Sequence, residues 1–416
     1  MKCPDSIRAL DRDDPLAHTI DHFELPAQTQ YLDGNSLGPL PRTSRQRLAA
    51  VTEQQWGQDL ITSWNKHDWI KLPRKVGDKI AKLIGAAPGQ VVCCDSTSVN
   101  LFKVLSTALQ IQASHGRHRI ISQQDNFPTD LYMVEGLNSL LGNNRCELVS
   151  VHADQLISSL DDSVAVLMLT QVNFRTGHCH DIRTLTEAAH QAGALVIWDL
   201  AHSAGAMPLS LDEWQVDFAV GCGYKYLNGG PGAPAFVYAA TRHHGVSSQP
   251  LTGWMGHAKP FEFSPSYTAA PTIDQYLCGT PSVLAMSALD AALDVFDGVS
   301  LDVLRAKSLA LSDLFINTLR AADCWQEFTL LTPTEHTRRG SQVALAHPQG
   351  YAITQALIAD RCVIDFRAPD VIRFGFTPLY LRYEDVWLAA QKLIRIIDTQ
   401  TYLQPEYSRA AVGPVT

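Results

Sequence analysis

Apolar and polar positions along the chain predict strands and helices in turn. Short apolar runs, rich in β-branched and aliphatic residues, predict strands at 90–94, 119–122, 147–151, 164–170, 194–199, 218–222 and 234–238. Stretches with helical spacing predict helices between them, such as 99–113, 131–141 and 182–191. Near-continuous apolar strands that alternate with helices are typical of a mostly parallel sheet covered by helices. We therefore expect one large α/β domain over residues 51–285.

The pattern changes after the turn at Gly279-Thr-Pro281. Helices are predicted at 282–296 and 301–322, and strand-like segments at 327–331, 342–346 and 371–376 then mix with helices at 350–360 and 383–400. This mixture favours a smaller α+β domain over residues 286–416. Residues 1–50 are rich in turn formers, so we expect them to pack with the small domain rather than fold alone.

Composition and charge narrow the class of protein. The 33 Lys and Arg against 42 Asp and Glu give a net charge of −9, which argues against nucleic acid or an anionic membrane as a partner. No run approaches the about 18 apolar residues of a membrane helix, and the N-terminus lacks an apolar signal segment. The nine cysteines are scattered without C-x-x-C spacing, so neither a disulfide framework nor a zinc module is indicated. We expect a cytoplasmic protein with reduced thiols.

The first candidate for chemistry is Asp199, which ends the apolar run 194–199. Ligands bind just beyond the carboxyl ends of strands in open parallel sheets. A carboxylate at the edge of a buried layer needs a cation or hydrogen-bond donors. Taken alone, however, Asp199 is more readily explained as a loop or helix-capping carboxylate.

Lys225 follows the next apolar run and precedes the glycine-rich turn 228–232. Desolvation is expected to lower the pKa of a lysine that leaves a buried strand, as a Schiff-base amine requires; the alternative is a surface lysine with a buried stem. Together, Asp199 and Lys225 supply the two groups that pyridoxal phosphate requires, a carboxylate for the pyridinium nitrogen and an amine for the aldehyde. The pair therefore predicts a site for this cofactor.

Phosphate binding is predicted where helix 99–113 begins. No P-loop or dinucleotide fingerprint occurs, but the hydroxyls of Thr97 and Ser98 and the first helix amides could hold an anion. Simple N-capping explains the same residues. Tyr224 could add a hydroxyl donor. Phe127 follows the strand at 119–122 and could stack on the cofactor ring, although core packing is the commoner role of phenylalanine.

Six segments together resemble the kynureninase family, in the class V branch of fold-type I pyridoxal-phosphate enzymes. They occur in order over most of the chain, at 31–38, 127–130, 198–205, 224–232, 253–257 and 373–380. The tyrosine before Lys225 separates the chain from desulfurase and transaminase relatives, which usually carry histidine there. The resemblance implies an aspartate-aminotransferase-like fold, with a large domain around a mostly parallel sheet and a smaller α+β C-terminal domain.

The resemblance also implies roles for the residues that match. Lys225 would bond to the cofactor, Asp199 would bind the pyridine nitrogen and Phe127 would stack on the ring. The phosphate of the cofactor would be contacted by Thr97, Ser98 and Tyr224. Further contacts with the cofactor are implied for Asp130, Thr170 and His202.

Three more matches concern the substrate and a second subunit. Trp254 and Thr280 would reach the phosphate bound by the neighbouring subunit, which implies a homodimer with shared active sites. Arg373 would bind the α-carboxylate of the substrate, a task suited to a guanidinium fork. Thr280 stands where animal members carry Asn, and Trp64 stands where they carry His. Because both positions bear on the aromatic ring, the preferred ring substituent stays open.

The implied reaction is hydrolysis of the Cβ–Cγ bond of L-kynurenine, or of 3-hydroxykynurenine. The products are L-alanine and anthranilate, or 3-hydroxyanthranilate, in tryptophan catabolism by the kynurenine pathway and in NAD biosynthesis. Lys225 would remove the α-proton, Asp199 would keep the ring protonated, and Tyr224 would be a general acid.

Three other interpretations are weighed against this one. A cysteine desulfurase would use Cys324 or Cys362 as persulfide carrier, but neither lies in the Gly/Ser-rich loop that such a carrier usually occupies. A non-catalytic sensor with the same fold would normally add a basic DNA-binding module, for which there is no room before Tyr31. A metal enzyme would use the segment His178-Cys-His180-Asp181 or the pair His243-His244, but adjacent and i,i+2 pairs on loops are usually polar surface residues. We expect no metal.

Overall fold

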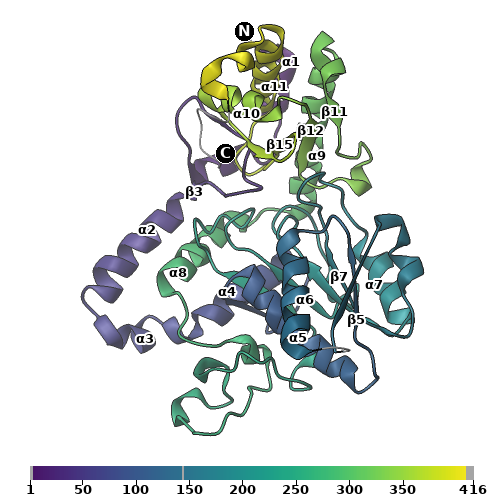
Figure 1. Cartoon of the computed structure of the whole chain (residues 1–416). Helices are drawn as coiled ribbons and strands as arrows, with labels where there is room; N and C mark the ends of the chain where they lie inside the picture. The colour runs from purple at the N-terminus through teal and green to yellow at the C-terminus, as the bar shows by residue number, and fades with distance from the viewer. Residues whose placement is uncertain (1–2, 143–144, 409–416) are drawn as a thin grey trace. The chain divides into compact units, whose positions relative to one another are not determined.

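A computed structural model describes residues 3–142 and 145–408, and the chain folds into two compact units (Figure 1). The larger unit comprises Thr43–Asn173 and His180–Leu293, and the smaller comprises residues up to Arg42, Phe174–Cys179 and residues from Asp294 onward. The predicted limits at 50/51 and 285/286 stay predictions, and their outer ends at 1 and 416 lie outside the described residues. The short segment 174–179 belongs to the smaller unit although it lies within the sequence of the larger one.

The larger unit is built on a seven-stranded sheet with the order β4-β10-β9-β8-β7-β5-β6. Its strands are β4 (Val91–Cys94), β5 (Arg119–Gln123), β6 (Glu147–Val151), β7 (Val164–Thr170), β8 (Leu195–Asp199), β9 (Phe218–Gly221) and β10 (Ala235–Ala239). Only β10 runs antiparallel to its neighbours, β4 and β9. The expected mostly parallel sheet is thus confirmed, and the carboxyl ends of six strands meet at one edge.

Helices cover both faces of this sheet because its strands are apolar on both faces. The helices of the chain from α2 to α8 are α2 (Arg42–Ala50), α3 (Ser63–Lys66), α4 (Leu72–Leu83), α5 (Thr97–Ala113), α6 (Pro128–Leu141), α7 (Ile182–Gln191) and α8 (Val283–Ala292). Residues of α5 such as Leu101 and Leu105 pack in one core with Ile197 and Val220 of the strands. On the opposite face, Trp198 donates a hydrogen bond to Thr186 of α7.

The smaller unit is an α+β structure, as expected for the C-terminal part. Its four-stranded antiparallel sheet has the order β11-β12-β15-β14, and β2 pairs in parallel with β13. Its helices are α1 (Asp5–Arg12), α9 (Leu301–Arg320), α10 (Gly350–Ala359) and α11 (Tyr383–Asp398). Its strands are β1 (Phe23–Glu24), β2 (Gln30–Tyr31), β3 (Leu40–Pro41), β11 (Thr329–Leu330), β12 (Gln342–Ala346), β13 (Cys362–Val363), β14 (Asp365–Arg367) and β15 (Val371–Gly375). Through β2, the N-terminal segment is part of this unit.

Among the described residues, no helix is long and apolar enough to cross a membrane. All nine cysteines are free thiols.

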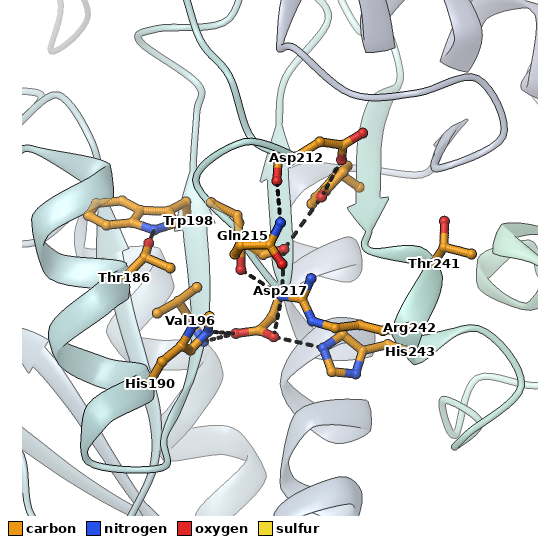
Figure 2. Close-up of polar contacts among 12 residues, drawn as sticks. Thr186, His190, Val196, Trp198, Asp212, Gln215, Asp217, Thr241, Arg242 and His243 are labelled. Carbon is orange, nitrogen blue, oxygen red and sulfur yellow. Dashed lines mark hydrogen bonds and ion pairs between the residues drawn. The ribbon is translucent and has the colours of Figure 1, made fainter.

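The start of β9 is held by a buried charge cluster around Asp217 (Figure 2). Its carboxylate accepts hydrogen bonds from His190 at 2.8 Å, His243 at 2.7 Å, Arg242 at 2.8 Å and the backbone N–H of Val196 at 2.9 Å. Burial alone would raise the pKa of Asp217, but the two histidines and Arg242 outweigh it and hold this pKa well below its usual value. The cluster therefore joins α7, β8, β9 and the turn after β10 through one ionised carboxylate.

Replacing Asp217 by Asn is expected to lower the free energy of unfolding by about 3 kcal/mol, because the buried cluster loses its charge. The difference in the free energy of unfolding between the variant and the unchanged protein should be constant from about pH 8 to pH 5. It should shrink below about pH 4, because there the carboxylate of Asp217 binds a proton in the unfolded chain but not in the folded protein. Urea unfolding curves across this pH range measure both effects. Glu187→Gln, on an exposed ion pair of α7, is the control expected to leave the midpoint unchanged. An unchanged midpoint for Asp217→Asn would contradict the structural role.

Candidate active site

The carboxyl edge of the sheet holds Thr170, Asp199 and the end of β9, from which the chain reaches Lys225. Thr170 ends β7 and lies opposite Asp199, which ends β8, and Asp199 lies opposite Val220 of β9. The chain then leaves β9 at Gly221 and reaches Lys225 in the following turn. Two of these groups were predicted from separate apolar runs, and the register explains why they share one edge.

Asp199 is a buried carboxylate, only 4% exposed. Its Oδ1 accepts a hydrogen bond of 2.7 Å from the N–H of Ala201, which is the only hydrogen bond to this side chain within the described residues. Burial raises the pKa of Asp199, while the charge of Lys225 and the bond from Ala201 lower it in part. One carboxylate oxygen is therefore satisfied locally, and the other is left for a further donor or cation.

Lys225 lies beside His202, with its Nζ 3.0 Å from Nε2 of the imidazole. His202 is buried and Lys225 is half-buried, so the amine is held at the protein interior rather than extended into solvent. The same Nζ lies 5.9 Å from the centre of the Tyr224 ring. The amine of Lys225 thus faces a histidine and an aromatic ring, with the charge of Asp199 nearby.

Asp130 is a second buried carboxyl at this edge, at 2% exposure. It accepts a hydrogen bond of 3.1 Å from the hydroxyl of Thr170. Burial first, and the charge of Asp199 second, raise the pKa of Asp130 well above its usual value. Three of the predicted contacts, Asp130, Thr170 and Asp199, are therefore neighbours in the structure.

These charges test whether pyridoxal phosphate fits. Asp130 and Asp199 are both buried, and Lys225 is the cation that acts on each of them. A buried carboxylate with one uncommitted oxygen favours an added cation. A protonated pyridine N–H supplies both a positive charge and a donor for Asp199, while the amine of Lys225 remains for the aldehyde. The chemistry of the donor set therefore fits this cofactor.

Tyr224 is a phenol that stays protonated at neutral pH. Burial, together with Cys222 and the charge of Asp199, raises the pKa of Tyr224 well above its usual value. A protonated phenol next to Lys225 can donate a hydrogen bond or a proton, but it cannot be a base.

The start of α5 differs from the prediction in a way that bears on Thr97 and Ser98. The helix begins at Thr97 rather than at residue 99, and Ser96 is its N-cap, accepting a bond of 3.4 Å from the N–H of Val99. The capping role that could have explained Thr97 and Ser98 thus belongs to Ser96. Both residues lie in the first turn, where backbone N–H groups lack helical acceptors and favour an anion.

The remaining predicted contacts lie on loops and short helices. Phe127 precedes α6 at its N-cap position and is 39% exposed. Trp254 begins a 3₁₀ turn, Trp254–Gly256, and packs edge-on against Phe261. Thr280 is exposed on the loop before α8. Trp64, in α3, packs edge-on against Trp69 with 6.1 Å between ring centres.

Arg373 lies on β15 of the smaller unit and is 1% exposed. Its Nε donates to Asp365 at 2.8 Å, its Nη2 donates to the other oxygen of Asp365 and to Ser36 Oγ at 2.9 Å, and its Nη1 donates to the carbonyl of Phe174 at 2.5 Å. The side edge of the guanidinium is therefore bound by a carboxylate. Outside that edge, Nη2 has the hydroxyl of Ser36 as its partner and Nη1 has the carbonyl of Phe174.

Asp365, which orients Arg373, was not among the residues predicted for the site. Burial would raise the pKa of Asp365, but Arg373 and Arg367 lower it below its usual value. Burial and the charge of Asp365 raise the pKa of the neighbouring Asp33 to about 7. A carboxylate eight positions before an arginine carries no local signal, since the two meet only because β14 and β15 pair antiparallel.

The structure weighs against the rival interpretations. Cys324 and Cys362 are buried, and burial raises the pKa of their thiols to about 11 and about 12, so neither is a ready nucleophile. His243 binds Asp217. In the described part of the chain, no group of three or more His, Cys, Asp or Glu side chains could hold a metal ion.

Comparison with solved structures shows the fold. The cysteine desulfurase of Thermococcus onnurineus NA1, in its apo form, superposes with a TM-score of 0.75 at 18% identity, over 96% of this chain and 99% of the other. A variant of the lyase C-DES with glycine covalently linked to its PLP cofactor gives a TM-score of 0.75 at 17% identity, over 88% of this chain and 97% of the other. The chain has the fold-type I architecture expected from its sequence.

Comparison of sequences shows the family. The family description "Kynureninase C-terminal domain" matches residues 304–393. A kynureninase of Burkholderia pseudomallei (strain 1106a) is 48% identical, covering 99% of this chain and all of its own length. A kynureninase of Pseudomonas fluorescens is 47% identical over 96% of each chain. With half of its residues shared along almost its whole length, the chain belongs to the kynureninase family.

Proposed function

We propose that this protein uses pyridoxal phosphate to hydrolyse the Cβ–Cγ bond of L-kynurenine, or of its 3-hydroxy derivative, in tryptophan catabolism. The observation that carries the proposal is the placement of Lys225 close enough to the buried carboxylate of Asp199 for its charge to lower the pKa of that carboxylate, in a chain of this family. When bound, the cofactor bonds covalently to a lysine or substrate amine and accepts the electron pair released at the substrate α-carbon.

Asp199 and Lys225 have distinct tasks in this reaction. The free oxygen of Asp199 accepts the pyridine N–H and holds that proton on the ring. Lys225 would supply the amine that bonds to the cofactor and, when free, would take the α-proton of the substrate and return it. Tyr224, whose phenol stays protonated, supplies a proton in the later steps. The hydrogen bond from Thr170 to Asp130 holds both side chains in place beside Asp199.

Arg373 binds the substrate α-carboxylate in this proposal. Asp365 fixes the guanidinium by its side edge, and Nη1 and Nη2 would offer two N–H donors to the carboxylate in place of the Phe174 carbonyl and the Ser36 hydroxyl. Phe127, His202, Thr97 and Ser98 complete the cofactor contacts. Trp64 and Thr280 bear on the aromatic ring, so a steady-state comparison of kynurenine with 3-hydroxykynurenine decides which substrate is preferred.

The proposal includes a homodimer in the cytoplasm, with Trp254 and Thr280 completing the partner's site. Large apolar side chains stay exposed in the single chain near these residues and near Trp64, namely Trp56 at 58%, Leu60 at 61%, Ile61 at 75%, Phe261 at 63% and Phe263 at 75%. Such clusters are typical of surfaces that a partner covers. The nine free thiols suit a reducing compartment.

Purified protein with pyridoxal phosphate is expected to convert L-kynurenine into equal amounts of anthranilate, followed by its fluorescence, and L-alanine. Lys225→Met should lose both this turnover and the visible absorbance of lysine-bound cofactor, because Lys225 supplies the amine that would form the bond. Lys71→Met, an exposed lysine paired with Asp68, is the matched control and should keep both. Release of sulfide from cysteine, without anthranilate from kynurenine, would overturn the proposal in favour of a desulfurase.

Asp199→Asn is expected to lower kcat about a hundredfold or more, since the ring loses the charge that holds its proton. Because burial raises the pKa of Asp199, removing the charge should not lower the unfolding midpoint of the cofactor-free protein. Steady-state kinetics and thermal unfolding, measured on the same preparation, separate the two effects. A fall in both kcat and the midpoint would mark Asp199 as a structural carboxylate instead.

Shared sites predict that two inactive variants restore activity when mixed. Lys225→Met lacks the amine, and Thr280→Asp places a carboxylate where the partner's phosphate would lie. In a mixed dimer one site has both Lys225 and Thr280, so equilibrated subunits should recover up to about a quarter of full activity. Each variant incubated alone is the control. If the mixture stays inactive while subunits exchange, Thr280 does not serve the partner's site.

A further inference from the structure

Lys103 is a fully buried lysine in the middle of α5 that the reaction does not use. It is 0% exposed, and its Nζ donates to Asp95 Oδ2 at 2.5 Å and to the backbone carbonyl of Tyr276 at 2.5 Å. The thiol of Cys94 lies 3.8 Å from the same atom. A buried ammonium is costly unless paired, so this placement calls for an explanation.

We propose that Lys103 is a positioning residue for the cofactor phosphate, which it serves by tying together the two segments that would hold phosphate. One is the turn at Asp95 that opens α5 and presents Thr97 and Ser98. The other is the chain from Tyr276 to Thr280, which would reach the partner's phosphate. This inference rests on the proposed function, because it takes phosphate to bind at these segments.

The Asp95 turn has a backbone conformation that needs support. Asp95 has a φ of 44°, in the left-handed region that non-glycine residues seldom adopt. Its backbone carbonyl accepts from the N–H of Ala235 at 2.9 Å, and the Asn100 side chain donates to the Cys94 carbonyl at 2.7 Å. Lys103 adds the only ion pair of this turn among the described residues. The direction in which the first amides of α5 point therefore depends on that contact.

The second segment is joined to Lys103 through Tyr276. Tyr276 ends the 3₁₀ turn Ile273–Tyr276, and the chain continues through Cys278 toward Thr280. The carbonyl of Cys278 accepts from the N–H of Met255 at 3.1 Å, next to Trp254. Gly253 permits this approach, since a Cβ there would lie 2.3 Å from the Cys278 carbonyl oxygen. The segment before Trp254 is thus packed against the chain that leads to Thr280, and Lys103 binds that chain at Tyr276.

The charge of Lys103 is permanent at neutral pH. Burial alone would lower the pKa of Lys103, but Cys94 and Asp95 outweigh it, so the pKa lies above its usual value. The ammonium can donate to a carboxylate and a carbonyl at once, whereas methionine, which is of similar length, has no N–H to donate to either.

The test compares two ligands that differ only in the phosphate, pyridoxal phosphate and pyridoxal, titrated into cofactor-stripped full-length protein. Lys103→Met is expected to lower the affinity for pyridoxal phosphate about tenfold or more. The affinity for pyridoxal, which bonds to Lys225 but has no phosphate, should change less than about twofold. Equal losses for both ligands, or no loss for pyridoxal phosphate, would overturn the inference.

Two further variants keep the outcome clear. Lys307→Met is the matched control, since Lys307 is also buried and also binds one carboxylate, Asp14 at 2.7 Å, and one backbone carbonyl, Pro378 at 2.6 Å, in the smaller unit. It should lower the unfolding midpoint and leave the ratio of the two affinities unchanged. If Lys103→Met does not fold, Asp95→Asn is tested in its place, because asparagine also tolerates the left-handed conformation of this turn. It should lower the affinity for pyridoxal phosphate more than the affinity for pyridoxal. Failure of the unchanged protein to bond pyridoxal phosphate at Lys225 would instead refute the proposed function.

Discussion

A carboxylate held in the interior without a full set of partners is the constraint on which this site depends. Asp199 ends a strand that is buried on both faces, and its position opposite Thr170 and Val220 is set by the sheet register. Folding therefore leaves an acidic group in a buried position with one oxygen not bound by any described residue, and with Lys225 as the nearby cation. Such an arrangement lowers the stability of the folded protein without its cofactor, and it favours binding of a cationic ring.

The sequence predicted much of the fold because the elements at the centre of the larger unit have strong local patterns. Strands 147–151 and 164–170 and helix 182–191 were predicted with the limits that the structure has. Asp199 and Lys225 could be found because each follows an apolar run, and parallel strands deliver their ends to one edge. The start of α5 was placed two residues late, since Ser96 rather than a later residue caps the helix.

The supporting contacts could not be predicted, because they join residues that are far apart in the sequence. Lys103 and Tyr276 are separated by 173 positions, and the charge cluster of Asp217 joins β9 to α7, β8 and the turn after β10. Asp365 reaches Arg373 through the pairing of two short strands. Periodicity shows that a position is buried, but it does not show which buried group meets another. The sequence indicates such a contact only where a charged residue, such as Lys103, stands among the apolar positions of a helix, because a buried charge needs a partner.

The pairing of buried cations separates structural from reactive groups. Lys103, Lys307 and Arg373 are each bound by an aspartate and by a backbone carbonyl, so each is fixed in place. Lys225 instead has a histidine at 3.0 Å, and within the described residues no carboxylate lies within ion-pair distance of it. An amine clamped by a carboxylate would be protonated and immobile, and could neither bond to an aldehyde nor carry a proton. Aspartates thus hold the structural cations in place, whereas the amine that the chemistry needs contacts a histidine instead.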